Sequence, residues 1–175
     1  MMSCIGDESR KKLVENIAGA ITDRTKAVIL NSPCNPTGMI LGREILSEIA
    51  ALAKKHDLWV LSDEVYRTIV FGGECASILE MPGMKQRTIL IDSFSKRFSM
   101  TGFRVGFVCA PKEIAQAVAN LQENVNSCAC MFAQYACMAA LENCEEAEKE
   151  ICSVFKRRCE AMTKEIQKST RLVPA

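Results

Sequence analysis

A strand, a helix and a second strand follow one another in the first half of the chain, and this order restricts the possible folds more than any other feature. Runs of apolar residues predict strands at Lys26–Asn31 and Leu58–Ser62, and helical spacing predicts a helix at Arg43–Lys55 between them. A connection of this length allows the two strands to pair in parallel while the helix covers one face of the sheet. The sequence therefore predicts an α/β fold.

Two more strands extend the predicted sheet, at Arg87–Ile91 and Arg104–Ala110. The fourth strand follows the third after too few residues for a parallel crossover, so we predict that it runs antiparallel beside it. Helical patterns cover Glu8–Ile21, Lys112–Gln122, Met131–Leu141 and Glu145–Lys168. The expected architecture is a mostly parallel sheet with one antiparallel strand, followed by helices.

Polar residues follow the ends of the three predicted parallel strands. In chain order they are Asn35, Asp63, Ser93 and Lys96. Open α/β sheets bind ligands beyond the carboxyl ends of their parallel strands. The antiparallel fourth strand would return Arg104, at its beginning, to the same edge. We therefore expect these residues to form one binding site.

Lys96 lies among residues that can hold a phosphate. A lysine amine can form a Schiff base with a carbonyl. Ser93 and Ser95 offer hydroxyl groups, and Arg104 offers a guanidinium group that can bind a phosphate through two parallel hydrogen bonds. These residue types favour an aldehyde that carries a phosphate, and pyridoxal 5′-phosphate fits this description. Lys96 is therefore the candidate catalytic residue.

The other polar residues each have a structural interpretation as well. Asn35 stands in a segment with two prolines and a glycine, which predicts a rigid turn. Asp63 follows an apolar strand, where a carboxylate requires a partner such as a protonated pyridine nitrogen, but it or Glu64 could instead cap a helical turn. Tyr66 could hydrogen-bond a cofactor oxygen or bury its ring with the hydroxyl in water.

The spacing of Ser93 and Lys96 also matches the serine and lysine of penicillin-binding enzymes, which require Ser-Asp-Asn and Lys-Thr-Gly partners. Here Glu64 stands where the asparagine of the first partner is required, and Met100 stands where the lysine of the second is required. The sequence therefore disfavours that chemistry.

Composition describes an ordinary globular chain. Its 175 residues carry a net charge of +1, which gives no basis for binding nucleic acid. No apolar stretch approaches the ~20 residues of a membrane span, and the first residues show no secretion signal, so we expect a cytoplasmic protein without membrane contact. The ten cysteines are expected to be mostly reduced and packed on helical faces, and with one histidine and no Cys-x-x-Cys pair we predict no metal site.

Three motifs, taken in order, resemble those of the class I and II, fold type I aminotransferases of the aspartate aminotransferase type, which depend on pyridoxal phosphate. They are Asn35-Pro-Thr-Gly38, Ser62-Asp-Glu-Val-Tyr66, and Ser93-x-Ser-Lys96 with Met100-Thr-Gly-Phe-Arg104. The resemblance implies a three-layer α/β/α large domain, here incomplete. It also implies transfer of an amino group between an amino acid and a 2-oxo acid.

The same resemblance implies a role for each motif residue. Lys96 would form the Schiff base and later move a proton of the substrate, and Asp63 would keep the pyridine nitrogen protonated. The 3′ oxygen of the cofactor would be hydrogen-bonded by Asn35 and Tyr66. The phosphate would be held by Ser93, Ser95 and Arg104.

The chain is less than half as long as a usual member of that family, so we expect it to be part of an enzyme. Residues 1–142 would belong to the cofactor-binding large domain, and residues 143–175 would form a long helix leading toward a C-terminal small domain. The complete protein would be a homodimer that acts on small molecules. Two alternatives stay open: a truncated, inactive chain that binds the cofactor, and a lyase or cyclase of the same fold.

Overall fold

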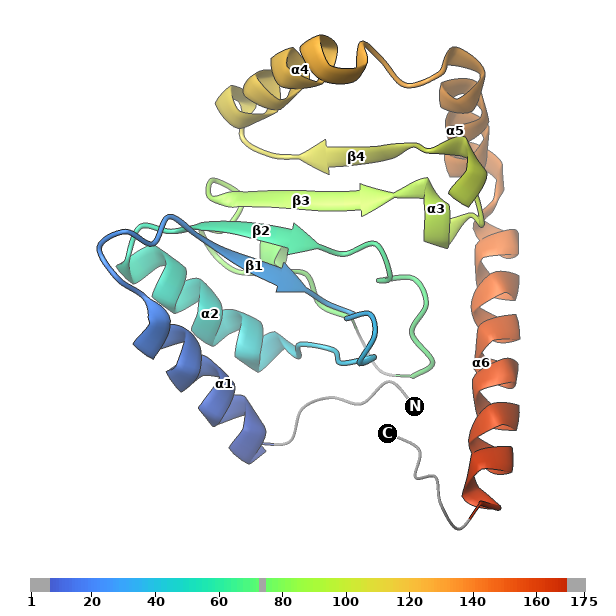
Figure 1. The fold of residues 1–175 in the computed structure, drawn as a ribbon, viewed down its shortest axis with the longest axis horizontal. Coiled ribbons are helices and arrows are strands. Elements are labelled where there is room, and N and C mark those ends of the chain that lie inside the picture. The colour runs from blue at the N-terminus through green and yellow to red at the C-terminus, as the bar shows by residue number, and fades with distance from the viewer. Residues whose placement is uncertain (1–6, 73–74, 170–175) are drawn as a thin grey trace.

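The computed structural model describes residues 7–72 and 75–169, which form a four-stranded sheet with helices around it (Figure 1). The strands, in their spatial order, are β1 (Ala27–Asn31), β2 (Trp59–Asp63), β3 (Thr88–Ser93) and β4 (Gly106–Cys109). The first three are parallel, and β4 pairs antiparallel with β3. The predicted α/β fold, a mostly parallel sheet with one antiparallel strand, is therefore confirmed.

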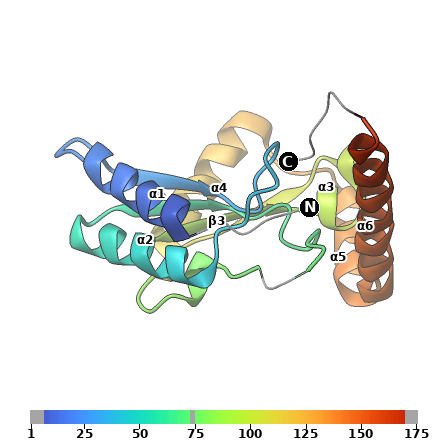
Figure 2. The same cartoon turned by 90° about the horizontal axis from the view of Figure 1, so that it is seen from below.

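Five longer helices surround this sheet: α1 (Asp7–Ala20), α2 (Arg43–Lys55), α4 (Lys112–Asn126), α5 (Met131–Asn143) and α6 (Glu145–Gln167). Three short ones connect the strands: η1 (Ile78–Glu80), α3 (Phe94–Arg97) and η2 (Thr101–Phe103). Helices α1 and α2 cover one face of the sheet, and α4 lies beyond β4 (Figure 1). Helix α6 stands across the end of the sheet, where β3 finishes, as Figure 2 shows from below.

Helix α2 carries the main core of the protein. Its buried side chains include Ile45 and Ile49, four residues apart and therefore on one face of the helix. They pack in one cluster with Leu30 of β1 and Val60 of β2. Glu44 in the first turn and two lysines in the last turn suit the helix dipole, which adds to the stability of the helix.

The two faces of the sheet differ in how far they are covered. Along β3, burial alternates with every residue, so that Thr88, Leu90 and Asp92 face the α2 side. On β1 the same alternation turns Ile29 to the other side, where its side chain is 74% exposed. The described helices thus leave that second face largely open. At the strand ends, Asn31, Asp63 and Ser93 lie on this face.

A second, smaller cluster lies between the end of β3 and helix α5. It contains Phe94, Met100, Cys137 and Ala140, with Cys144 packed against it. The expected packing of cysteines on a helical face is found for Cys137 and Cys144. Cys130, which precedes α5, is exposed. Among the helices of the described residues, none combines the length and the apolar character of a membrane span.

Strands β3 and β4 approach each other closely at the edge where the site is expected. Ser93 is the register partner of Gly106, and a Cβ atom on Gly106 would lie 3.0 Å from the carbonyl oxygen of Asp92. Arg104 has a left-handed backbone with φ of 56°, which ends η2 and interrupts the extended conformation. The fourth strand therefore begins at Gly106 and not, as predicted, at Arg104.

Candidate functional site

The carboxyl ends of the three parallel strands meet at one edge of the sheet. Asn31 at the end of β1 is the register partner of Asp63 at the end of β2, and β3 ends nearby at Ser93. Helix α3 begins at the next residue and carries Lys96. The topology thus brings side chains from distant parts of the sequence to one place.

Asn35, Tyr66 and Lys96 form one group at this edge. The side-chain amide of Asn35 donates a hydrogen bond to the hydroxyl oxygen of Tyr66, with 3.1 Å between Nδ2 and Oη. The Lys96 ammonium lies over the Tyr66 ring, with Nζ 5.7 Å from the ring centre, a distance at which a cation interacts favourably with an aromatic face. Three of the residues predicted from three separate motifs are therefore neighbours. The hydroxyl of Tyr66 thus has a polar partner at an exposed position, and its role toward a cofactor stays a prediction.

Asp63 is held by its neighbours on two sides. Its Oδ2 accepts a hydrogen bond from Asn31 Nδ2 at 3.2 Å, and its Oδ1 accepts one from the backbone N–H of Val65 at 3.3 Å. The second contact closes a local turn, as in the capping role that the sequence also allowed for Asp63. The first ties the carboxylate to β1 and fixes its direction. In addition, the Oδ1 of Asn31 is buried without a protein partner, so this corner has an unused acceptor.

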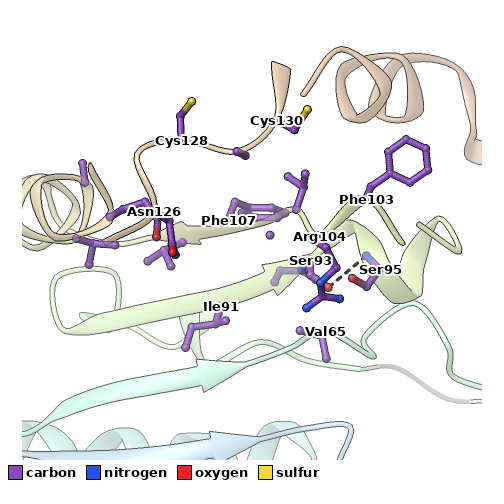
Figure 3. A pocket seen from close by; sticks show the side chains of 18 of the residues that line it. Val65, Ile91, Ser93, Ser95, Phe103, Arg104, Phe107, Asn126, Cys128 and Cys130 are labelled. Atoms are coloured by element: carbon purple, nitrogen blue, oxygen red, sulfur yellow. Dashed lines mark hydrogen bonds between the residues drawn. The ribbon is translucent and has the colours of Figure 1, made fainter. Parts of the chain in front are cut away.

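Ser93, Ser95 and Arg104 line a cleft of about 1240 Å³ (Figure 3). The Ser93 hydroxyl accepts a hydrogen bond from the backbone N–H of Ser95 at 3.3 Å, and this contact caps helix α3. Arg104 Nη1 donates to the carbonyl oxygen of Thr101 at 3.1 Å, which directs the guanidinium group along η2. Two hydroxyl groups and a guanidinium group thus share one cavity wall, a donor set suited to a phosphate.

The predicted residues fall into two adjoining groups. Asn35, Asp63, Tyr66 and Lys96 do not line the cleft that holds the two serines and Arg104. Val65 connects the groups, because it lines the cleft and lies in sequence between Asp63 and Tyr66. In Figure 3 it is drawn below Arg104. The arrangement could accept an elongated ligand with a phosphate at one end.

Asp92 is a buried carboxyl group that precedes Ser93 in the chain and also lines the cleft. Burial raises its pKa, while the N–H of Ser93, which donates to Oδ1 at 2.7 Å, and the positive charge of Arg97 act in the opposite direction. A raised pKa means that the folded state binds the proton more tightly than the unfolded state. Ionisation of Asp92 therefore costs stability, fully so above its folded-state pKa. This cost shrinks as the pH falls below the folded-state pKa and is gone below the unfolded-state pKa.

Two residues of this edge were not predicted as site residues. Asn31 binds Asp63, and Glu64 is buried just beyond it. A signal for Asn31 existed, because two parallel strands that end together place their last residues side by side. Nothing in the local sequence distinguished Glu64 from a surface residue. Within residues 7–72 and 75–169, no three His, Cys, Asp or Glu side chains gather as they would around a metal ion.

The sheet and its helices define an α/β domain with polar side chains gathered at the carboxyl ends of its parallel strands. The chain belongs to the family described as aminotransferase class I and II, whose sequence model matches residues 3–174. The motif resemblance found in the sequence is thereby confirmed at the level of the family.

Named relatives lead to the same family. The chain is 43% identical over 129 residues to aspartate aminotransferase of Thermotoga maritima, covering 74% of this chain and 34% of the relative. It is 41% identical over 143 residues to (5-formylfuran-3-yl)methyl phosphate transaminase of Methanocaldococcus jannaschii, covering 82% and 37%. The solved structure of N-succinyldiaminopimelate aminotransferase from Mycobacterium tuberculosis superposes with a TM-score of 0.86 at 30% identity, covering 89% and 41%. The chain thus spans less than half the length of these relatives.

Proposed function

We propose that this chain is the cofactor-binding core of an aminotransferase that moves an amino group between an amino acid and a 2-oxo acid, with pyridoxal 5′-phosphate as its cofactor. One observation carries the proposal: the contact between Asn35, Tyr66 and Lys96, with 3.1 Å from Asn35 Nδ2 to Tyr66 Oη and 5.7 Å from Lys96 Nζ to the Tyr66 ring. A lone lysine would need no such surroundings, because most lysines are exposed charges. Membership of the aminotransferase family supports the same conclusion.

The residues present fit this cofactor. It is an aromatic aldehyde with a phenolic oxygen, a ring nitrogen and a phosphate, and the edge of the sheet offers a matching group for each. The two hydroxyls and the guanidinium group that line the cleft suit the phosphate, and the amide and phenol pair suits an oxygen. Asp63, fixed by Asn31, offers a carboxylate to a protonated nitrogen.

Each residue has a task that follows from its chemistry. Lys96 would provide the amine that condenses with the aldehyde as water leaves, and its Nζ could later take up and return a proton of the substrate. Asp63 would hold a proton on the ring nitrogen by its negative charge. When bound, the cofactor supplies an electron sink for the carbanion of the substrate. Ser93, Ser95 and Arg104 would hold the phosphate by hydrogen bonds and charge.

The organisation of the complete protein follows from the same hypothesis. Residues 1–142 are part of the cofactor-binding domain, and residues 143–175 lead toward a small domain; residues 1–6 and 170–175 lie outside the described residues. The complete enzyme works as a cytoplasmic homodimer. The relatives named above carry different substrate names, so the proposal names an amino acid and a 2-oxo acid and no particular pair.

The test is covalent capture of the cofactor. The purified chain is mixed with pyridoxal phosphate, reduced with borohydride, digested and analysed by mass spectrometry. We expect the reduced adduct on Lys96 and a visible absorption band before reduction that is absent from Lys96→Ala. The matched control is Lys85→Ala, which removes an amine outside the site and should leave the band unchanged.

Equal labelling of many lysines, or a band that survives in Lys96→Ala, would contradict the proposal. The reaction is tested separately, by adding an amino acid and a 2-oxo acid and measuring the new 2-oxo acid. An adduct on Lys96 without turnover would favour the alternative of an inactive cofactor-binding chain. Release of ammonia in place of amino transfer would favour a lyase of the same fold.

A further inference from the structure

Glu64 is a buried carboxylate immediately beside Asp63. Its side chain is among the most buried polar groups of the described residues, with 3% of its surface exposed. A carboxylate in such a position destabilises the fold unless it is bound by donors or a cation. The neighbouring side chains must therefore supply hydrogen-bond donors or a positive charge.

Three donors from three points of the chain bind this carboxylate. Oε1 accepts hydrogen bonds from the hydroxyl of Ser62, at 3.0 Å, and from the hydroxyl of Ser77, at 2.7 Å. Oε2 pairs with Nη1 of Arg67 at 3.3 Å. Ser62 belongs to β2 and Ser77 precedes η1, so Glu64 joins the strand end to a segment that lies elsewhere in the sequence.

The backbone of Glu64 is tied into the sheet as well. Its N–H donates to the carbonyl oxygen of Ile91 on β3 at 3.0 Å, and its carbonyl oxygen accepts from the N–H of Arg67 at 2.9 Å. These bonds define the turn that carries Tyr66. The turn is therefore held at Glu64 by the backbone and by the side chain together.

Glu64 and Asp63 lie on opposite sides of the sheet edge. Ser62 and Glu64 are buried on the side of α2, whereas Asp63 contacts Asn31 and Val65 lines the cleft on the other side (Figure 3). Glu64 thus does not face the ligand. It binds from behind the segment whose front carries Asp63 and Tyr66.

We infer that Glu64 is a positioning residue: bound by Ser62, Ser77 and Arg67, it fixes the 63–67 turn so that Asp63 and Tyr66 point toward the cofactor. This inference rests on the proposed function for the identity of the ligand. The fixed turn itself can be measured without any ligand.

The main variant is Glu64→Gln, which keeps the size of the side chain but removes its charge and places an amide where hydroxyl groups now donate. Hydrogen exchange is followed by mass spectrometry on the full 175-residue chain, for peptides that contain residues 64–69 and for peptides from α2. We expect exchange in the 64–69 segment to rise roughly tenfold, with α2 unchanged. Pyridoxal phosphate should bind roughly tenfold more weakly to this variant, measured by the yield of the Lys96 adduct.

The matched control is Glu165→Gln. Glu165 is an exposed carboxylate near the end of α6, where its Oε1 accepts a hydrogen bond from Lys168 Nζ at 2.7 Å. In this variant, hydrogen exchange of the 64–69 segment and binding of pyridoxal phosphate should equal those of the unmodified chain. A second variant, Ser62→Ala, removes a single donor and leaves the carboxylate in place. It therefore tests the same point with less disturbance of the fold. We expect hydrogen exchange of the 64–69 segment to rise roughly threefold.

Two results would overturn the inference. One is exchange of the 64–69 segment that is the same in Glu64→Gln and in Ser62→Ala as in the unmodified chain. The other is a rise that extends equally over α2, because this would describe a loss of general stability. If the unmodified chain forms no adduct on Lys96, the proposed function fails, and the exchange data still decide whether Glu64 fixes the turn.

Discussion

The region that α1 and α2 cover and the region around β4 are built from similar amounts of apolar sequence, yet they bury it very differently. In the covered region, taken as residues 7–72 and 75–93, thirteen buried residues form one cluster, among them Ile49, Leu58 and Met84. In the open region, taken as residues 94–143, only four residues form the corresponding cluster, and α4 has no buried residue. Phe132 and Leu121 are 72% and 65% exposed.

The difference teaches where the stability of this chain comes from. Burial of apolar surface is the main driving force of folding and is roughly proportional to the area removed from water. The covered region therefore gains more stability from apolar burial, while the open region has only the few apolar contacts near α3 and α5. The candidate site lies along the boundary between the two, since Asp63 belongs to the first region and Arg104 leads into the second.

The largest expected effect is the loss of a core side chain in the covered region. Ile49→Ala should lower the free energy of unfolding by about 2–5 kcal/mol, because the residue is 1% exposed and its removal leaves a cavity. Leu121→Ala on α4 should change it by less than about 0.5 kcal/mol. Urea unfolding of both variants measures the difference. Equal losses would mean that α4 is packed in solution and that the two regions do not differ.

An intermediate effect is expected from the ion pair that joins α3 to α6. Arg97 Nε lies 2.8 Å from Glu148 Oε2, and only 17% of the Glu148 side chain is exposed. Glu148→Gln should reduce the free energy of unfolding by about 1 kcal/mol, since a partly buried charged hydrogen bond is lost. Glu145→Gln breaks an exposed pair with Lys149 on the same helix and should cause no measurable change. Identical urea midpoints for the two variants would contradict this ranking.

The smallest effect concerns reactivity and leaves stability unchanged. Burial raises the pKa of the Cys137 thiol, whereas Cys130 is exposed. The thiolate is the reacting form, so alkylation of Cys137 should become appreciable only at a higher pH than alkylation of Cys130, and should be roughly tenfold slower at neutral pH. Peptide mass spectrometry after timed alkylation measures both rates. The difference should vanish in urea, and equal rates without urea would show that the α5 cluster is open.

Much of the fold could be predicted because each signal was local. The apolar runs at β1, β2 and β3 began within one residue of the observed strands, and the short link before β4 decided its direction. The start of β4 was less certain, because the left-handed backbone of Arg104 depends on the turn of η2 and not on the residue type. Helix α3, only four residues long, gave no periodic pattern that could be detected.

For the site, the sequence predicted which residues gather at the strand ends, and the roles given to them stay predictions. Glu64 was beyond the reach of this reasoning. Its burial depends on Ser77, thirteen residues further along the chain, and on the side of the sheet to which the segment turns. A sequence of polar residues does not by itself tell which one faces the ligand and which one faces the core.

Lys96 and Arg97 are consecutive, yet their side chains contact different elements of the molecule. Lys96 lies over Tyr66, and Arg97 binds Glu148 on α6. Any displacement of α6 would therefore reach the amine through a single peptide unit. A spectroscopic label on Lys96 would therefore report motion of helix α6. Its signal would measure how strongly α6 and the candidate site are coupled.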